Sequence, residues 1–217
     1  MRQTGVRKLS AVQRSHIDAL RAQINEHAPA RKVVDVPAAF QEIFPHKGLP
    51  RGAVSCMNPS SALAIELIAH TTAAGGYVGV VGWEGLSYAG VESLDTIIVV
   101  PQSDLNVVAS LAESVDLIFY RGPEAHLSPT QSRPLMAKVR KGVASVVMVG
   151  VDVASPAVRL SGRISTFHGI GCGTGRITSF DLELCCQAHG MSRSTTVTIG
   201  AGGVAASTRT QVPACAL

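Results

Sequence analysis

The sequence predicts an α/β fold: a mainly parallel, doubly wound sheet with helices on both faces, followed by antiparallel strands at the C-terminus. The first observation is composition, since the chain is 46% hydrophobic but only 4% aromatic and contains 21 Gly. Aliphatic residues must therefore fill the core, as they do in buried parallel strands. The second is that short aliphatic runs alternate with helix-like segments as far as residue 151. At 217 residues, the chain suits one compact core and is too short for two.

The elements of the parallel part follow from turn and capping residues as well as from the apolar runs. A strand at 33–36 is followed by a short helix at 37–44 and by a tight turn at 48–52. Ser60 or Ser61 can cap a helix that Gly75-Gly76 ends. The helices are expected at 63–74, 106–114 and 134–141, and the central strands at 54–57, 77–82, 95–100, 116–120 and 145–151.

Beyond Pro156 the pattern changes to an alternation of apolar and polar residues. Segments 158–166, 175–184 and 195–199 have this two-residue period, which predicts an antiparallel meander. The glycine-rich run 169–175 superficially resembles a dinucleotide fingerprint, but no helix follows it, so a hairpin loop is the better interpretation. We therefore divide the chain into three parts: an arm at 1–32, a core at 33–205 and a flexible tail at 206–217.

The arm is expected to be a basic amphipathic helix that ends at Pro29. Its net charge is +5, from seven Lys or Arg against two carboxylates, but without interleaved aromatic residues a solvated face explains this charge better than a DNA contact. The apolar stripe can pack on the chain's own core or dock on a partner. The candidate partner-binding residues in this stripe are Leu9, Ile17, Leu20 and Ile24.

The most informative motif lies between the strand at 54–57 and the helix that follows it. Asn58-Pro59-Ser60-Ser61 stands where a phosphate-binding loop would open. Such a loop needs G-x-x-x-x-G-K-[ST], because backbone N–H groups surround the phosphates, the Lys neutralises them and the hydroxyl holds Mg²⁺. Here the decisive tripeptide is Ala62-Leu63-Ala64. The frame of a nucleotide site is therefore present without the side chains that the chemistry requires.

Other catalytic or metal-binding patterns are weak. The seven His are scattered, no G-x-S-x-G occurs, and the five Cys include no C-x-x-C pair, so neither a disulfide framework nor a zinc ribbon is expected. His168-x₃-Cys172 and Cys185-x₃-His189 have a metal-like spacing, but on strands they would need a turn to share one ion. With no long apolar span and no signal-peptide pattern, we predict a cytoplasmic protein.

The segment from Gly48-Leu49-Pro50-Arg51-Gly52 to a strand ending near Glu84 resembles the core of the RecA recombinase. It resembles more closely the actinobacterial ImuA-prime proteins, which are RecA-like accessory factors of the DNA-damage-induced mutasome. The resemblance covers residues 5–213, although its sharpest motifs are short. It implies a RecA-like core for this chain.

Residue by residue, the resemblance implies a degenerate nucleotide site. The phosphate-loop Gly, Lys and hydroxyl residue correspond to Ala62, Leu63 and Ala64, and one loop residue is missing before Ser60. Losing the Lys and the Mg²⁺ ligand removes the principal sources of catalysis in phosphoryl transfer. We therefore expect no ATP hydrolysis, no catalytic residue, no cofactor and no metal ion.

Two further positions of the RecA pattern lie after strands. Arg121 stands where the family has an Asp that supports Mg²⁺, and Glu84 matches the glutamate that positions the attacking water. Arg121 could neutralise a phosphate in place of the missing cation, but the simpler interpretation pairs it with Glu84 or Asp116.

By the same resemblance, the chain is expected to be a non-catalytic adaptor of error-prone translesion synthesis in the SOS response. The implied partners are an ImuB-like Y-family hub protein, an error-prone C-family polymerase and RecA, with DNA contacted weakly or through these partners at the nucleoid. Two alternatives stay open: a RecA-like cell-division inhibitor of the SulA type, and an atypical RecA-like ATPase. The oligomeric state, including a homo-oligomer, also stays open.

Overall fold

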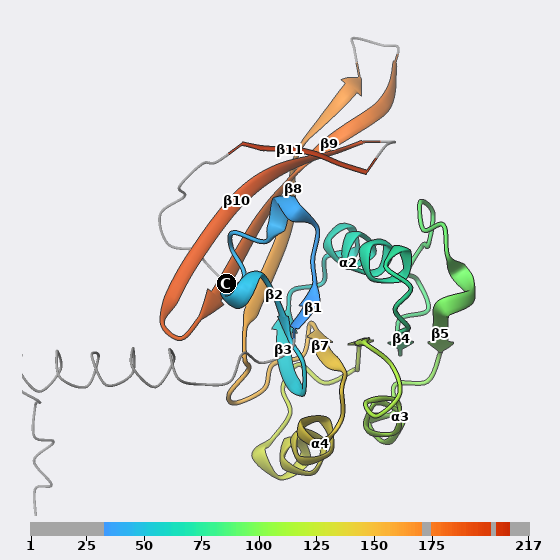
Figure 1. The fold of residues 1–217 in the computed structure, drawn as a ribbon, viewed down its shortest axis with the longest axis vertical. Coiled ribbons are helices and arrows are strands. Elements are labelled where there is room, and N and C mark those ends of the chain that lie inside the picture. Colours follow the sequence, from blue (N-terminus) through green and yellow to red (C-terminus); the bar gives the residue numbers. More distant parts are fainter. Residues whose placement is uncertain (1–32, 171–174, 201–202, 209–217) are drawn as a thin grey trace, which may run out of the picture. The chain divides into compact units, whose positions relative to one another are not determined.

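The computed structural model of the chain describes residues 33–170, 175–200 and 203–208. The predicted arm lies outside the described residues, so Leu9, Ile17, Leu20 and Ile24 are not placed. Within the described residues, a nine-stranded sheet has the strand order β11-β10-β9-β8-β3-β7-β6-β4-β5, and β1 and β2 form a separate two-stranded sheet (Figure 1). The predicted fold class is confirmed.

Five strands form the parallel half of the large sheet. All residues of β4, β6 and β7 are buried, which explains their continuous aliphatic sequences. β5 is the edge strand, and its Ile98 and Val99 are exposed. The five strands, in sheet order, are β3 (Ala53–Met57), β7 (Ser145–Val149), β6 (Leu117–Tyr120), β4 (Val78–Val81) and β5 (Ile97–Val100).

Helices cover both faces of this parallel half. Figure 1 shows α2 (Ser61–Ala73) on one face, and α3 (Leu105–Leu111) and α4 (Pro129–Lys141) on the other. Each face has its own buried apolar cluster, one containing Leu67 of α2 and the other containing Val139 of α4. No helix in the described ranges is both long and apolar enough to cross a membrane.

α4 begins at Pro129 and not at the predicted Pro134. The Ser128 hydroxyl accepts a hydrogen bond from the N–H of Gln131 at 3.4 Å, and the Gln131 side chain accepts one from the N–H of Ser128 at 3.1 Å. This capping box, with a proline at the first helical position, fixes the start of the helix. Pro134 therefore lies inside the helix, where the prediction placed its beginning.

The segment that precedes β3 departs most from the prediction. The predicted helix at 37–44 is only a 3₁₀ turn, η1 (Ala38–Phe40), and a second 3₁₀ turn, η2 (Pro45–Lys47), follows it. The side chains of Phe40 and Phe44 are buried in the cluster on the α2 face. Burial of these rings, and not a helical period, decides how this segment folds.

Part of the predicted turn at 48–52 is a strand. β2 (Gly48–Pro50) pairs in antiparallel fashion with β1 (Val33–Asp35), and all three of its residues are buried. The turn itself is confined to Arg51 and Gly52. Similarly, the predicted strand at 95–100 begins as a 3₁₀ turn, η3 (Leu94–Thr96).

The C-terminal meander is confirmed, with longer strands than predicted. β8 joins it to the parallel half, because β8 pairs in parallel with β3 over only two residue pairs, Cys56 with Arg159 and Met57 with Leu160. β8 and β9 form an antiparallel hairpin, which confirms the interpretation of the run 169–175; residues 171–174 lie outside the described ranges. β11 crosses the predicted boundary between 205 and 206. The strands are β8 (Arg159–Ile170), β9 (Gly175–Ala188), β10 (Met191–Gly200) and β11 (Gly203–Thr208).

Arg51 forms hydrogen bonds to three separate segments at the amino ends of the parallel strands. Its guanidinium donates hydrogen bonds to the carbonyl of Val33 (3.3 Å), to the carbonyl of Val143 (3.0 Å) and to Asp116 Oδ1 (2.6 Å). The other Asp116 oxygen accepts from the N–H of Tyr77 at 2.9 Å. Burial of Asp116 opposes its ionisation, but the hydrogen bonds from Tyr77 and Arg51, with the charge of Arg51, outweigh burial and lower the pKa of Asp116.

We expect Asp116→Asn to lower the free energy of unfolding at neutral pH by about 1–3 kcal/mol, because Arg51 loses a charged partner inside the fold. Since the pKa of Asp116 is lower in the folded state, its contribution is present above the unfolded value of about 3.9 and is lost as pH falls through the folded value. Urea unfolding at several pH values measures the difference. The difference in the free energy of unfolding between the wild type and Asp116→Asn should shrink below about pH 4. A difference that stays constant down to acid pH would contradict the pairing of Asp116 with Arg51. The control Glu113→Gln alters an exposed carboxylate and should change the neutral-pH free energy by less than about 0.5 kcal/mol.

Candidate functional site

The loop between β3 and α2 is the predicted phosphate-binding loop, and its polar groups bond to one another. Ser60 caps α2: its hydroxyl oxygen accepts a hydrogen bond from the N–H of Leu63 at 3.4 Å. The N–H of Ser60 donates to the carbonyl of Asn58 at 2.7 Å. A phosphate-binding loop keeps such N–H groups free for its ligand. Here two of them already have partners within the chain.

The backbone of β8 lies against this loop. The Asn58 side chain donates a hydrogen bond to the carbonyl of Gly162 at 3.1 Å and accepts one from the N–H of Gly162 at 2.9 Å. The Asn58 amide thereby extends the short pairing of β3 with β8. A Cβ atom at position 162 would lie 2.7 Å from Ser60 Oγ and 3.0 Å from Leu63 Cβ. Only a glycine therefore lets β8 approach so closely.

The side chains at the decisive loop positions belong to the core. Leu63 is 1% exposed and Ala64 is fully buried. Both lie in the apolar cluster that also contains Met57 of β3 and Leu160 of β8. A lysine at position 63 would therefore enter an apolar environment.

The remaining loop residues differ in how far they are buried. Ala62 is partly buried against the same apolar cluster. Pro59 and Ser61 are exposed. Their side chains contribute no charge to the loop.

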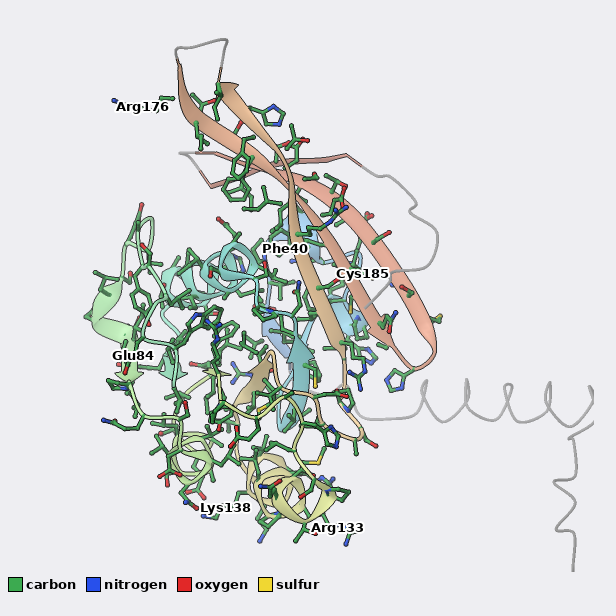
Figure 2. The ribbon with its side chains drawn as sticks, turned by 180° about the vertical axis from the view of Figure 1, so that it is seen from behind. Phe40, Glu84, Arg133, Lys138, Arg176 and Cys185 are labelled. Atoms are coloured by element: carbon green, nitrogen blue, oxygen red, sulfur yellow. The ribbon has the colours of Figure 1, made fainter. Side chains whose placement is uncertain are left out.

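Glu84 and Arg121 follow β4 and β6, two neighbouring strands, at the carboxyl edge of the sheet. Both side chains are exposed, and Figure 2 shows Glu84 at the margin of the molecule. The guanidinium carbon of Arg121 lies over the Trp83 ring, 5.5 Å from its centroid, which is a cation–π arrangement. The structure thus brings Arg121 to the predicted edge but holds it against an aromatic ring.

The predicted ion pair between Arg121 and either Glu84 or Asp116 is wrong. Asp116 precedes β6 and Arg121 follows it, so the two residues lie at opposite ends of one extended strand. Asp116 pairs with Arg51, and no ion pair between described residues joins Arg121 to Glu84.

Two described cysteines are free and buried, and neither is activated. Burial raises the pKa of Cys56 to about 11 and that of Cys186 to about 12. Both thiols are therefore protonated near neutral pH and are poor nucleophiles. Cys185 is disulfide-bonded, which the cysteine spacing does not predict. Among the described residues no three His, Cys, Asp or Glu side chains converge as a metal site would require.

Comparison with known proteins places the loop within a described family. The family model described as the MT3502 N-terminal domain matches residues 42–155, which is more than half of the chain. The chain belongs to the MT3502 N-terminal domain family. The matched segment contains the loop, Glu84 and Arg121, and it ends before Gly162.

One relative and two solved structures are also similar to this chain. The Mycobacterium tuberculosis protein Rv3395c is 24% identical over 171 residues, covering 71% of this chain and 84% of that protein. The crystal structure of the RadB recombinase has a TM-score of 0.51 at 15% identity, covering 77% of this chain and 96% of that one. A KaiC-like protein from Pyrococcus horikoshii gives a TM-score of 0.48 at 9% identity. The likeness to RadB shows that the fold is RecA-like.

Sequence reasoning missed the two residues that complete this region, Gly162 and Trp83. Gly162 interrupts an otherwise alternating strand, and a glycine inside a strand is the signal of a close backbone approach. Trp83 is the single Trp of the chain and lies two residues after β4, but nothing in its spacing indicates that Arg121 would cover it.

We expect Gly162→Ala to destabilise the protein by about 1–3 kcal/mol, because the added methyl group overlaps Ser60 and Leu63 unless β8 moves away. Urea unfolding measures the change. The matched control is Gly85→Ala, since a Cβ at position 85 meets no atom within 4 Å. Equal stability of the two variants would mean that β8 does not rest on the loop.

We also expect Leu63→Lys to lower the free energy of unfolding by about 2–4 kcal/mol, because it replaces a buried apolar side chain with a charge inside the apolar cluster. Ser61→Lys places the same charge in the same helical turn at an exposed position, and should cost less than about 1 kcal/mol. A stable Leu63→Lys protein whose melting temperature rises with added ATP would show that the loop can still accept a phosphate.

Proposed function

We propose that this chain is a non-catalytic accessory protein that acts through protein–protein contacts. The observation that carries the proposal is the burial of Leu63 beneath the backbone of β8, at the position where a phosphate-binding lysine would stand. Phosphoryl transfer depends almost entirely on positioning and on charge stabilisation. A loop with apolar, buried side chains at positions 63 and 64 supplies neither at these positions.

Two residues at the carboxyl edge of the parallel strands support the same proposal. Arg121 places a cation where RecA proteins hold the carboxylate that supports Mg²⁺, and the cation is held by Trp83. Glu84 is exposed at this edge, and in the part of the chain that the structure describes no group of three metal-ligating side chains includes it. On this view the RecA-like core is a rigid scaffold, and binding takes place on other surfaces.

We further propose that the process served is error-prone translesion synthesis, as in the ImuA-prime proteins that the sequence resembles. The RecA-like fold is compatible with this role and supports a connection with DNA repair. The proposed partners are the ImuB-like hub protein, the error-prone C-family polymerase and RecA. The proposed contact surface is the apolar stripe of the arm, represented by Leu20 and Ile24.

The test is a pull-down of the hub protein, the polymerase, RecA and the division tubulin by the purified chain, with ATP and without it. We expect capture of the hub or RecA that is independent of ATP, and a loss of at least about tenfold in affinity for Leu20→Asp with Ile24→Asp, because a few apolar anchors carry most interface energy. The matched control is Ser15→Asp with Ala22→Asp, which adds the same charge on the opposite side of the predicted helix.

Three outcomes would contradict the proposal. Capture of the division tubulin alone would favour the division-inhibitor alternative. Binding that requires ATP, or ATP hydrolysis above background by the wild-type chain, would favour the atypical ATPase. Unchanged binding by the double Asp variant would exclude the arm as the contact surface.

A further inference from the structure

The exposed face of α4 carries four positive charges. The helix buries Ser132, Leu135 and Val139 against the core. The opposite face presents Arg133, Lys138, Arg140 and Lys141, all four exposed. Figure 2 shows Arg133 and Lys138 on the outer side of α4. The helix contains no Asp or Glu, so the charge of this face is of a single sign.

None of these four cations forms an ion pair with another residue that the structure describes. The ion pairs that join described residues involve other side chains, and α3, the helix packed beside α4, contains no carboxylate. Lys138, Arg140 and Lys141 lie in the last turn, where they also interact favourably with the helix dipole. Arg133 lies near the other end of the helix and gains nothing from that dipole. Helix stabilisation alone therefore does not account for the whole face.

The composition of the face indicates what kind of ligand it fits. None of the large exposed apolar side chains of the described residues lies on α4. A protein interface normally buries apolar or aromatic anchors at its centre, and a membrane-binding helix inserts apolar side chains among the lipids. A face with charge but without such anchors fits a ligand whose own surface is a row of anions.

We propose that the exposed face of α4 binds the phosphate backbone of duplex DNA without reading its sequence. Arg133 and Arg140 are seven residues apart, which places them about 10 Å apart along the helix. A duplex carries one phosphate for about every 3.4 Å on each strand, so a length of about 10 Å holds about three phosphates on each strand. The contact is direct, and it requires neither a nucleotide in the loop nor a partner protein.

The test is the binding of the full-length chain to a fluorescein-labelled duplex of about 25 base pairs, followed by anisotropy between about 50 and 300 mM NaCl. Replacing all four cations by Gln should weaken binding at least about tenfold and should reduce the slope of log K against log salt by about 3 to 4. Arg133→Lys with Arg140→Lys keeps the charges and should keep the slope. Circular dichroism checks that each variant remains folded.

The matched control removes four exposed cations elsewhere, by Lys47→Gln, Arg121→Gln, Arg163→Gln and Arg176→Gln, and should change the slope by less than about 1. Equal effects of the two quadruple variants would overturn the proposal, as would a wild-type chain that does not bind the duplex at low salt. Loss of binding in Arg14→Gln with Arg21→Gln, but not in the α4 variant, would assign the contact to the arm. Competition by poly-glutamate or phosphatidylserine vesicles as strong as that by unlabelled duplex would exclude a preference for DNA.

Discussion

The double hydrogen bond between the Asn58 side chain and the backbone of Gly162 connects the two halves of this fold. The parallel half ends at β3, and β3 pairs with β8 over only two residue pairs. The Asn58 amide continues that pairing by one step, because its N–H and C=O groups replace those of a further peptide unit. The position of the whole antiparallel meander relative to the parallel strands therefore depends on the loop that would otherwise hold a phosphate.

Two states of the loop can be compared: one that binds a phosphate, and the observed one, in which β8 packs against the loop. A phosphate needs free N–H groups at the start of α2, whereas here Ser60 caps the helix and Gly162 rests on Ser60 and Leu63. To reopen the loop, β8 would have to move, and the apolar contacts that Leu160 and Leu63 share within one cluster would be lost. The same contacts that stabilise the fold thus give these groups of the loop partners within the chain.

The two ends of the parallel strands are secured by different chemistry. At the amino ends, Arg51 and Asp116 form a charged hydrogen bond that also holds β1 and the segment before β7. At the carboxyl ends, Arg121 is held on the Trp83 ring, and a neutral amide secures β8. The two ends of the parallel strands are thus joined by side chains from different parts of the chain.

The sequence alone determined the fold class, the order of strands and helices in the parallel half, and a cap of α2 at Ser60 or Ser61, of which Ser60 is the one observed. These features depend on local periodicity and on residues next to each other in the chain, such as buried aliphatic runs and a hydroxyl before a helix. The start of α4 was also encoded locally, in the capping box of Ser128 and Gln131, but the prediction gave more weight to Pro134. The absence of a lysine and a hydroxyl at positions 63 and 64 could likewise be read directly from the sequence.

Only the tertiary structure decided which distant groups meet. The pairing of β1 with β2, the contact of Gly162 with the loop, and the choice of Arg51 over Arg121 as the partner of Asp116 all join segments that no local pattern relates. Such contacts depend on strand order and on which end of a strand a residue occupies. The sequence identifies the residues of the candidate site, and the tertiary structure shows that β8 packs against the loop between β3 and α2.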